Sequence, residues 1–224
     1  MDIPNGNYIV VEGNIGAGKT SLSRMLAAEL NGRLILEEFS DNPFLPLFYQ
    51  NPERYAFPVE LFFMTERHKQ LQSLLIKGHL FQQYVVSDYT FSKTLLFAGQ
   101  NLENEELRLF RKLFYTLNAS FPKPNLLVYL HRSVNDLIEN IHKRGRAYEK
   151  DISAEYLEKI QKAYFSFFEI AQSEMAILFM DLEGLDFVHN PSDYQLILQQ
   201  LTQPYSKGIH QWSLQQSSAI KKTK

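Results

Sequence analysis

Two hydrophobic patterns alternate along the chain. Short apolar runs rich in Val, Ile, Leu and Tyr predict buried strands. These runs are Tyr8–Glu12, Leu34–Glu37, Tyr84–Asp88, Leu126–His131 and Ala176–Asp181. Longer segments between them carry apolar residues at helical spacing, at Thr20–Leu30, Arg54–Ile76, Glu103–Ser120, Val134–His142 and Ala154–Ser173. This alternation predicts an α/β fold, a doubly wound, five-stranded parallel sheet with helices on both faces.

Turn residues agree with several of these boundaries. Asn31-Gly32 caps a helix, and Asn190-Pro191-Ser192 opens a last helix. We expect one domain over residues 1–204. Residues 205–224 are polar, contain the single tryptophan, Trp212, and end in lysines, which predicts a frayed, disordered C-terminal tail.

Composition narrows the class of protein. Of the 224 residues, 45% are hydrophobic and 21% charged, which predicts a folded chain. The net charge of -2 argues against nucleic acid as a partner, and the absence of cysteine excludes disulfides and thiolate chemistry. Neither a signal sequence in the first six residues nor an apolar run long enough to span a membrane is visible. We therefore expect a cytoplasmic protein.

The most specific motif follows the first predicted strand. It matches the phosphate-loop pattern G-x-x-x-x-G-K-[ST] and consists of Gly13, Asn14, Ile15, Gly16, Ala17, Gly18, Lys19 and Thr20. Its backbone N–H groups and the start of the next helix favour phosphate oxygens. Lys19 is expected to reach the β- and γ-phosphates of ATP, and the Thr20 hydroxyl to ligate Mg²⁺.

Other motifs point to a small phosphoryl-transfer kinase. A GTPase needs Asn-Lys-x-Asp, which is absent, and Asp181-Leu182-Glu183-Gly184 lies too late to be its switch motif. Arg144 and Arg146, in the basic segment His142–Arg146 with Lys150 beyond it, are spaced to cover a transferring phosphoryl group. We expect this segment to form an Arg-rich lid.

Taken together, these motifs resemble the deoxynucleoside kinase family, in particular its bacterial deoxyguanosine/deoxyadenosine kinase branch. The resemblance runs from about Tyr8 to Asn190 and includes the phosphate loop, Leu36-Glu37-Glu38, Asn42-Pro43-Phe44-Leu45, Phe48–Pro52, Tyr55–Glu60, Val86–Tyr89, Lys143–Arg146 and Asp186-Phe187-Val188. It implies a P-loop kinase fold, transfer of the ATP γ-phosphate to a deoxynucleoside 5′-hydroxyl, Mg²⁺ and a homodimer.

The resemblance also implies roles for individual residues. Glu37 matches the base that accepts the 5′-hydroxyl proton, and Tyr49 and Glu149 match the pair that holds the sugar 3′-hydroxyl. Asp186 and Phe187 fall at ATP-binding positions, Arg67 at a base-contacting position, and Phe97 at the position of an aromatic that stacks on the base.

Two positions concern the choice of base. Glu60 stands where many relatives have Gln, and an ionised carboxylate only accepts hydrogen bonds, so it favours guanine N1–H and N2–H₂ over adenine. Most relatives carry an acidic residue followed by Arg in this region. Aligning Asp with Asp puts Tyr89 at the Arg position, whereas a gap-free match through Phe97-Ala98 puts Asp88 there, so neither register gives an Arg. Asp88 is still expected at the catalytic and substrate site, and Lys93 is the nearest cation that could replace the Arg.

These residues predict a purine deoxynucleoside kinase, with deoxyguanosine favoured and deoxyadenosine next. A nucleoside monophosphate kinase of the thymidylate type shares the loop, the fold and the lid, but it needs further cations for the acceptor phosphate. A non-catalytic nucleotide-binding regulator is the third alternative, and the presence of Lys19, Thr20, Glu37, Arg144 and Arg146 argues against it.

Overall fold

The computed structural model describes residues 3–4, 6–37, 42–75, 84–118 and 121–214. Its centre is a six-stranded sheet in the order β2-β3-β1-β4-β5-β6, and every pair of neighbours is parallel. The strands are β1 (Tyr8–Gly13), β2 (Arg33–Ile35), β3 (Val85–Ser87), β4 (Leu126–His131), β5 (Ala176–Asp181) and β6 (Gly208–Trp212). The predicted α/β class and parallel sheet are confirmed.

Helices connect these strands. They are α1 (Lys19–Glu29), α2 (Leu45–Gln50), α3 (Pro52–Leu75), α4 (Ser92–Asn101), α5 (Asn104–Asn118), α6 (Val134–Arg144), a 3₁₀ turn (Ala147–Glu149), α7 (Ala154–Ala171) and α8 (Pro191–Leu201). Sequence periodicity located α1, α3, α5, α6 and α7, to within two residues at each described end. Ile76 and Ser120, the predicted ends of two of them, lie outside the described residues.

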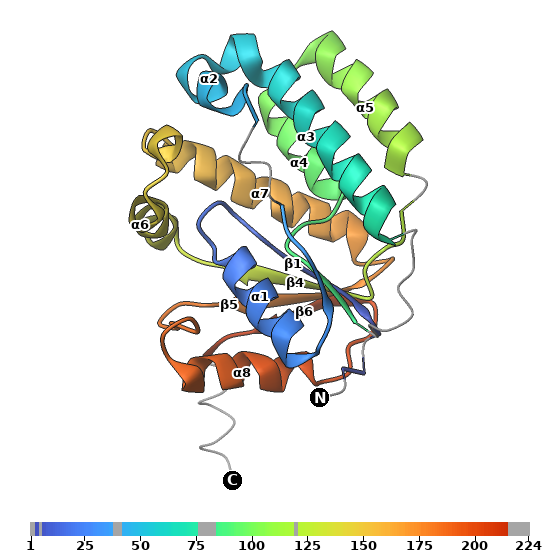
Figure 1. The fold of residues 1–224 in the computed structure, drawn as a ribbon, viewed down its shortest axis with the longest axis vertical. Helices are drawn as coiled ribbons and strands as arrows, with labels where there is room; N and C mark the ends of the chain where they lie inside the picture. Colours follow the sequence, from blue (N-terminus) through green and yellow to red (C-terminus); the bar gives the residue numbers. More distant parts are fainter. Residues whose placement is uncertain (1–2, 5, 38–41, 76–83, 119–120, 215–224) are drawn as a thin grey trace.

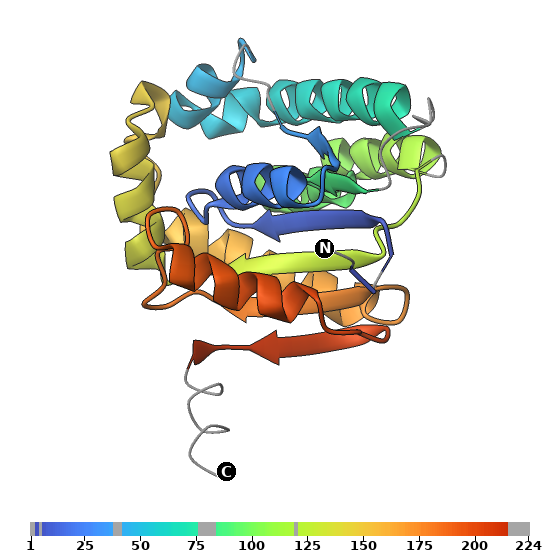
Figure 2. The same ribbon diagram turned by 60° about the horizontal axis from the view of Figure 1, so that its bottom comes forward.

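Helices cover both faces of the sheet. Alternate residues of a strand point to opposite sides, so each central strand contributes apolar side chains to both faces. In β4, Leu126 and Val128 pack in the cluster that contains α1 and α8, whereas Leu127 and Tyr129 pack against α7. Figure 2 shows α1 and α8 in front of the sheet and α7 behind it. A further apolar cluster joins α2, α3, α4 and α5, which gather at the end of the molecule farthest from α8 (Figure 1).

The number of strands corrects the sequence prediction. Residues 208–212 form β6, which pairs with β5, so the sheet has six strands rather than five and the proposed tail does not begin at 205. Two polar residues separate Ile209 from Trp212, so the segment shows neither the alternation nor the continuous apolar run that predicts a strand. Trp212 is 6% exposed and packs in the main core. Residues 215–224 of the predicted tail lie outside the described residues.

The parallel sheet brings the functional loops together. All six strands end at the same edge, so the phosphate loop after β1, Asp88 after β3 and Arg132 after β4 follow neighbouring strand ends. Ligands of open parallel sheets bind outside these carboxyl ends. Among the described residues, no helix is long and apolar enough to cross a bilayer.

Candidate active site

The phosphate loop has a conformation that depends on glycine. Gly16 and Gly18 have φ of 83° and 93°, in the left-handed region. A Cβ on Gly16 would lie 2.7 Å from the Leu137 carbonyl oxygen, and one on Gly18 would lie 3.0 Å from Phe187 Cζ. Helix α1 begins after Gly18 with neither a side-chain cap nor an acidic residue in its first turn. Its N–H groups therefore remain available for an anion.

Lys19 lies inside this loop. Its Nζ donates to the Asn14 carbonyl oxygen at 2.8 Å. Burial and the charge of Lys93 lower the pKa of Lys19 to about 8. The negative charges of Glu12, Glu37 and Asp88 oppose this shift. A bound phosphate would supply negative charge that this buried ammonium group otherwise lacks.

Neighbouring elements anchor the loop through residues whose role the sequence did not indicate. The Asn14 amide donates to the Leu157 carbonyl oxygen of α7 at 2.8 Å, so its side chain supports the loop. The Asn140 amide of α6 donates to the Gly16 carbonyl oxygen at 2.9 Å. Helices α6 and α7 therefore hold the loop from two sides.

Glu12, buried at the end of β1, was also missed. Its Oε1 accepts hydrogen bonds from the Thr90 N–H at 2.7 Å and the Thr90 hydroxyl at 3.0 Å, and its Oε2 accepts one from the Tyr164 hydroxyl at 2.8 Å. The Thr90 hydroxyl in turn accepts the Lys93 N–H at 3.2 Å. Glu12 thus fixes the start of α4, which carries Lys93, and only the folded sheet brings these groups together.

Thr20 and Asp88 form a pair beside the phosphate loop. The Thr20 hydroxyl donates to Asp88 Oδ2 at 2.6 Å, and the Glu37 N–H donates to Oδ1 at 2.7 Å. Burial and the charge of Glu37 raise the pKa of Asp88, although both hydrogen bonds lower it. A hydroxyl and a carboxylate next to a phosphate site are the oxygen ligands that Mg²⁺ uses in such sites. The pair therefore fits the expected metal.

Two cavities meet at this point. One, of about 550 Å³, extends from the phosphate loop between α2, α3, α4 and the lid, and the other, of about 590 Å³, lies between the loop, α6 and residues 185–189. Both are lined by Lys19, Thr20, Arg144 and Arg146. We call them the acceptor cavity and the donor cavity. Phosphate-binding groups therefore lie where one cavity passes into the other.

Glu37 lies in the acceptor cavity between two cations. Its Oε1 accepts hydrogen bonds from Arg67 Nε at 2.8 Å and Arg67 Nη2 at 2.5 Å, and its Oε2 pairs with Lys93 Nζ. Burial raises the pKa of Glu37, but Lys93 and Arg67 lower it by more, so the pKa lies well below its usual range. Glu37 is therefore an ionised carboxylate at neutral pH.

Glu60 lies deeper in the same cavity and is 2% exposed. Its Oε1 accepts a hydrogen bond of 2.6 Å from Asn101 Nδ2, while its Oε2 is buried and has no partner among the described residues. Burial raises the pKa of Glu60 to about 7, against the opposing charge of Arg67. Asn101 carries no motif that could have marked it.

The two residues predicted to bind the sugar are close together. Tyr49 stacks on Tyr148 with ring centroids 6.3 Å apart, and burial raises the pKa of Tyr49, with Tyr156 and Glu149 adding to the shift. Glu149 is 4% exposed and pairs with Arg144 Nη2 at 2.5 Å and Arg146 Nη1 at 3.3 Å. Glu149 thus connects the predicted sugar site to both lid arginines.

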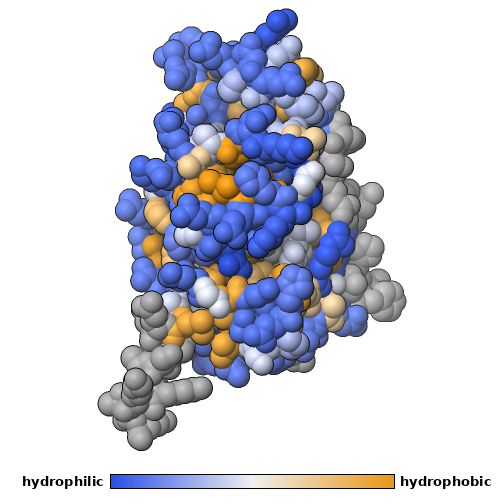
Figure 3. Space-filling view, turned by 90° about the vertical axis from the view of Figure 1, so that its left-hand side faces the viewer, coloured by the Kyte–Doolittle hydropathy of each residue, from blue (hydrophilic) through white to orange (hydrophobic). Residues whose placement is uncertain are grey.

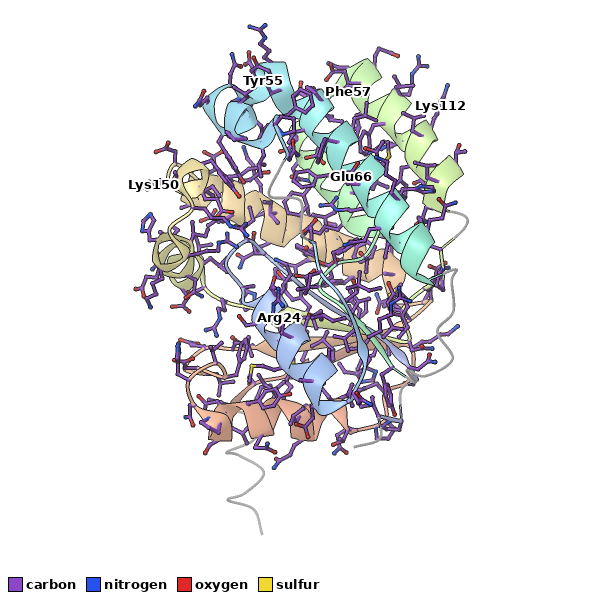
Figure 4. The ribbon with its side chains drawn as sticks, viewed as in Figure 1. Arg24, Tyr55, Phe57, Glu66, Lys112 and Lys150 are labelled. Atoms are coloured by element: carbon purple, nitrogen blue, oxygen red, sulfur yellow. The ribbon has the colours of Figure 1, made fainter. Side chains whose placement is uncertain are left out.

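The lid arginines lie at the end of α6, where Gly145 is left-handed with φ of 71°. Their side chains are partly exposed. The face drawn in Figure 3 is mostly hydrophilic, with an apolar patch near its middle. Lys150, labelled in Figure 4, is exposed and lines neither cavity. Arg24 of α1, labelled in the same figure, also lines the acceptor cavity and was not expected there.

The predicted ATP-binding residues Asp186 and Phe187 line the donor cavity. Arg132 holds their loop by donating to the Leu182 carbonyl oxygen at 3.3 Å and the Leu185 carbonyl oxygen at 3.0 Å. Hydrogen bonds from His189 lower the pKa of Asp186. Phe187 is buried against Gly18, so it closes the cavity beneath the phosphate loop.

The structure also shows where Tyr89 and Lys93 lie, near the position at which most relatives carry Arg. Tyr89 is fully buried in the cluster of α2 to α5, and its hydroxyl donates to Gln70 Oε1, so it does not face the phosphate loop. Lys93 instead places its ammonium group in the cavity, 5.5 Å from the ring centroid of Phe97. Phe97 is half-buried and lines the cavity, as expected for a residue that contacts a base.

The fold and the two joined cavities define a P-loop phosphotransferase with separate donor and acceptor sites. The family model "Deoxynucleoside kinase" matches residues 9–205, and the chain belongs to this family. It is 37% identical over 197 residues to a deoxyguanosine kinase of Bacillus subtilis, which covers 85% of this chain and 93% of that protein. It is 33% identical over 166 residues to a deoxyadenosine kinase of Dictyostelium discoideum, covering 73% of this chain and 67% of that protein.

A solved structure of a deoxyadenosine kinase from M. mycoides with bound dATP has the same fold, with a TM-score of 0.74 and 23% identity over 87% of this chain and 98% of that one. These findings confirm an ATP-dependent deoxynucleoside kinase and decide against the monophosphate kinase and the silent regulator. The relatives' names include both purines, so they do not decide which purine this chain prefers.

Proposed function

We propose that this kinase transfers the ATP γ-phosphate to the 5′-hydroxyl of a purine deoxynucleoside, with deoxyguanosine preferred over deoxyadenosine. The observation that carries the proposal is the buried carboxylate of Glu60 in the acceptor cavity, whose Oε2 lacks a hydrogen-bond donor. A buried acceptor without a partner is costly, so a ligand that brings a donor to it is favoured. Guanine brings N1–H and N2–H₂.

In this proposal Tyr49 and Glu149 hold the sugar 3′-hydroxyl, and Glu37 receives the hydrogen bond of the 5′-hydroxyl. All three residues line the cavity that also contains Glu60. Glu37 is ionised and can accept the 5′-hydroxyl proton as the O–P bond forms. Because Lys93 and Arg67 weaken it as a base, we expect proton transfer late in the reaction, when the nucleophilic oxygen has become more acidic.

Phe97 lies under the base, and Arg67 adds a contact through N–H groups that Glu37 and Thr94 do not use. The donor lies in the other cavity, with its phosphates on residues 13–20 and its base toward the loop that contains Asp186 and Phe187. Lys19, Arg144 and Arg146 line both cavities and would balance charge on the γ-phosphate during transfer.

Thr20 and Asp88 would hold Mg²⁺ beside these phosphates. Bound there, the ion would neutralise charge on the phosphate oxygens of the donor. Asp88 thus takes a metal-binding role in addition to its predicted place in the substrate site. Its hydrogen bond to the Glu37 N–H also fixes the backbone from which the base projects.

We also propose that the protein forms a homodimer through apolar side chains exposed on α5 and α7. These are Leu109, Leu113, Tyr115, Phe165 and Ile170, of which Ile170 is 77% exposed. Apolar surface of this kind is typical of interaction sites. A monomer in sedimentation velocity at micromolar concentration would contradict this part of the proposal.

The variant Glu60→Gln tests the reading of the base. Its amide can donate to adenine N1 and accept from N6, so the preference should move toward deoxyadenosine by roughly ten- to a hundredfold. The measurement is kcat/KM for both purines in the parent and the variant, with Glu66→Gln, on the same helix, as the control. A ratio that does not move would show that Glu60 does not read the base.

A further inference from the structure

The acceptor cavity contains a carboxyl group with two unequal oxygens. Glu60 Oε1 is held by the amide of Asn101 at 2.6 Å, at the end of α4, while Oε2 is buried and without a partner among the described residues. The Asn101 side chain also bonds to Tyr156 of α7, and all three residues line the cavity. Asn101 thus fixes one oxygen of Glu60 and leaves the other for a ligand.

The cations near Glu60 are bound elsewhere. Arg67, one helical face along α3, donates to Glu37 and Thr94, and Lys93 of α4 pairs with Glu37. The other titratable groups facing Glu60 are Glu37 itself, after β2, and Tyr156 of α7. Glu60 is therefore buried without an ion-pair partner in contact among the described residues.

Burial under these conditions raises the pKa of Glu60 to about 7; Arg67, Asn101 and Lys93 act against this rise, and Glu37 adds to it. The group can therefore gain or lose a proton within the range in which the enzyme is assayed. Because Asn101 donates to Oε1, the proton of the neutral acid is placed on Oε2, the oxygen without a partner.

The two protonation states fit different purines. Ionised, Oε2 accepts from guanine N1–H and is repelled by the adenine N1 lone pair. Protonated, Oε2–H donates to adenine N1 while Oε1 accepts from the N6 amine, and guanine N1–H then faces a donor. We propose that Glu60 and Asn101 form a proton-dependent base selector that favours deoxyguanosine when Glu60 is ionised and deoxyadenosine when Glu60 is protonated. This inference rests on the proposed purine kinase activity and adds regulation of the same site.

The test is the ratio of kcat/KM for deoxyguanosine to that for deoxyadenosine, measured from about pH 5.5 to about pH 8.5. Effects of pH on phosphoryl transfer are common to both substrates and cancel in the ratio, and kcat/KM reports ionisations of the free enzyme. We expect the ratio to fall roughly tenfold or more as the pH decreases, with a midpoint near the pKa of about 7. Infrared difference spectra should show a protonated carboxyl signal with the same midpoint.

Three variants separate the contributions. Glu60→Gln should give a low ratio that does not change with pH and should lack the infrared signal. Asn101→Ala removes the donor that favours the ionised form, so its midpoint should move to higher pH and its ratio at neutral pH should fall. Gln100→Ala, at an exposed position of the same helix, should match the parent.

Each outcome decides a different point. A parent ratio that stays constant with pH, or an Asn101→Ala midpoint equal to the parent's, would overturn the selector while leaving purine phosphorylation standing. A parent that phosphorylates neither purine at any pH would instead overturn the proposed function itself. If Asn101→Ala does not fold by circular dichroism, Asn101→Leu, which is close to Asn in size and has no donor, takes its place with the same expected direction.

Discussion

Glu37 shows how neighbouring side chains set the chemistry of a single residue. The sequence predicts a carboxylate at the end of a strand, but its state depends on contacts from other elements. Arg67 of α3 and Lys93 of α4 bind its two oxygens and keep its pKa well below the usual range, although burial alone would raise it. A carboxylate held in this way is ionised at neutral pH.

The variant Glu37→Gln keeps the shape and removes the proton acceptor. We expect kcat to fall by ~10²-fold or more with little change in the dissociation constant of the nucleoside. Steady-state kinetics and equilibrium binding measure the two quantities, and Glu53→Gln, exposed on α3, serves as control. A raised dissociation constant with unchanged kcat would make Glu37 a binding residue.

The low pKa of Glu37 also predicts how kcat depends on pH. Its proton leaves far below neutral pH, so kcat for deoxyguanosine should show no acid limb from Glu37 between about pH 5 and about pH 8. Acid inactivation of kcat in that range, lost in the Glu37→Gln variant, would contradict the ion pairs described here.

At the scale of elements, the sequence predicted the long regular segments better than the short ones. The strand Leu126–His131 is fully apolar to its last residue and was located correctly, since a buried parallel strand has a continuous hydrophobic signal. The hydrophobic pattern did not locate α2 and α4. Six residues give α2 too few helical turns for a pattern, and the buried positions of α4 include the polar residues Lys93 and Thr94, which interrupt its apolar periodicity. These two helices nevertheless supply Tyr49, Lys93 and Asn101 to the cavity.

In the proposed function, sugar binding and phosphate binding meet in the lid segment. Glu149 pairs with Arg144 and Arg146 and lies beside Tyr49, so a 3′-hydroxyl bound by Glu149 would also affect the arginines. The phosphate-loop motif predicted the loop on its own, because its spacing specifies the backbone. The Glu149 contacts could not be predicted, because they depend on how the 3₁₀ turn returns to the cavity.

The variant Glu149→Gln should lower kcat as well as nucleoside affinity. The parent should also prefer deoxyguanosine over its 2′,3′-dideoxy analogue by about tenfold or more, and the variant should lose most of that preference. Measured kcat and KM for both substrates, with Glu158→Gln on exposed α7 surface as control, check this. An effect on KM alone would show that Glu149 does not act through the arginines.

At the scale of the whole molecule, β6 completes the sheet. Trp212 packs with β5 and α8 in the main apolar cluster, whereas the polar composition of residues 205–224 had indicated a tail. Composition averages over the segment, but a single large side chain can determine whether an edge strand packs on the core.

Replacement of Trp212 by Ala should therefore destabilise the whole fold, by ~3–5 kcal/mol, because it leaves a cavity in the core. Urea unfolding followed by far-ultraviolet circular dichroism measures the change, and Trp212→Phe should cost less. An unfolding midpoint equal to the parent's would show that residues 208–212 contribute nothing to the core.

The central claim is that the acceptor cavity selects a purine deoxynucleoside and directs its 5′-hydroxyl to the γ-phosphate. The most direct measurement is kcat/KM for the four deoxynucleosides with ATP and Mg²⁺ at about pH 8, above the pKa of Glu60. We predict 5′-monophosphate products, with deoxyguanosine used most efficiently, deoxyadenosine next and both pyrimidines well below. A pyrimidine deoxynucleoside used more efficiently than either purine would contradict this account.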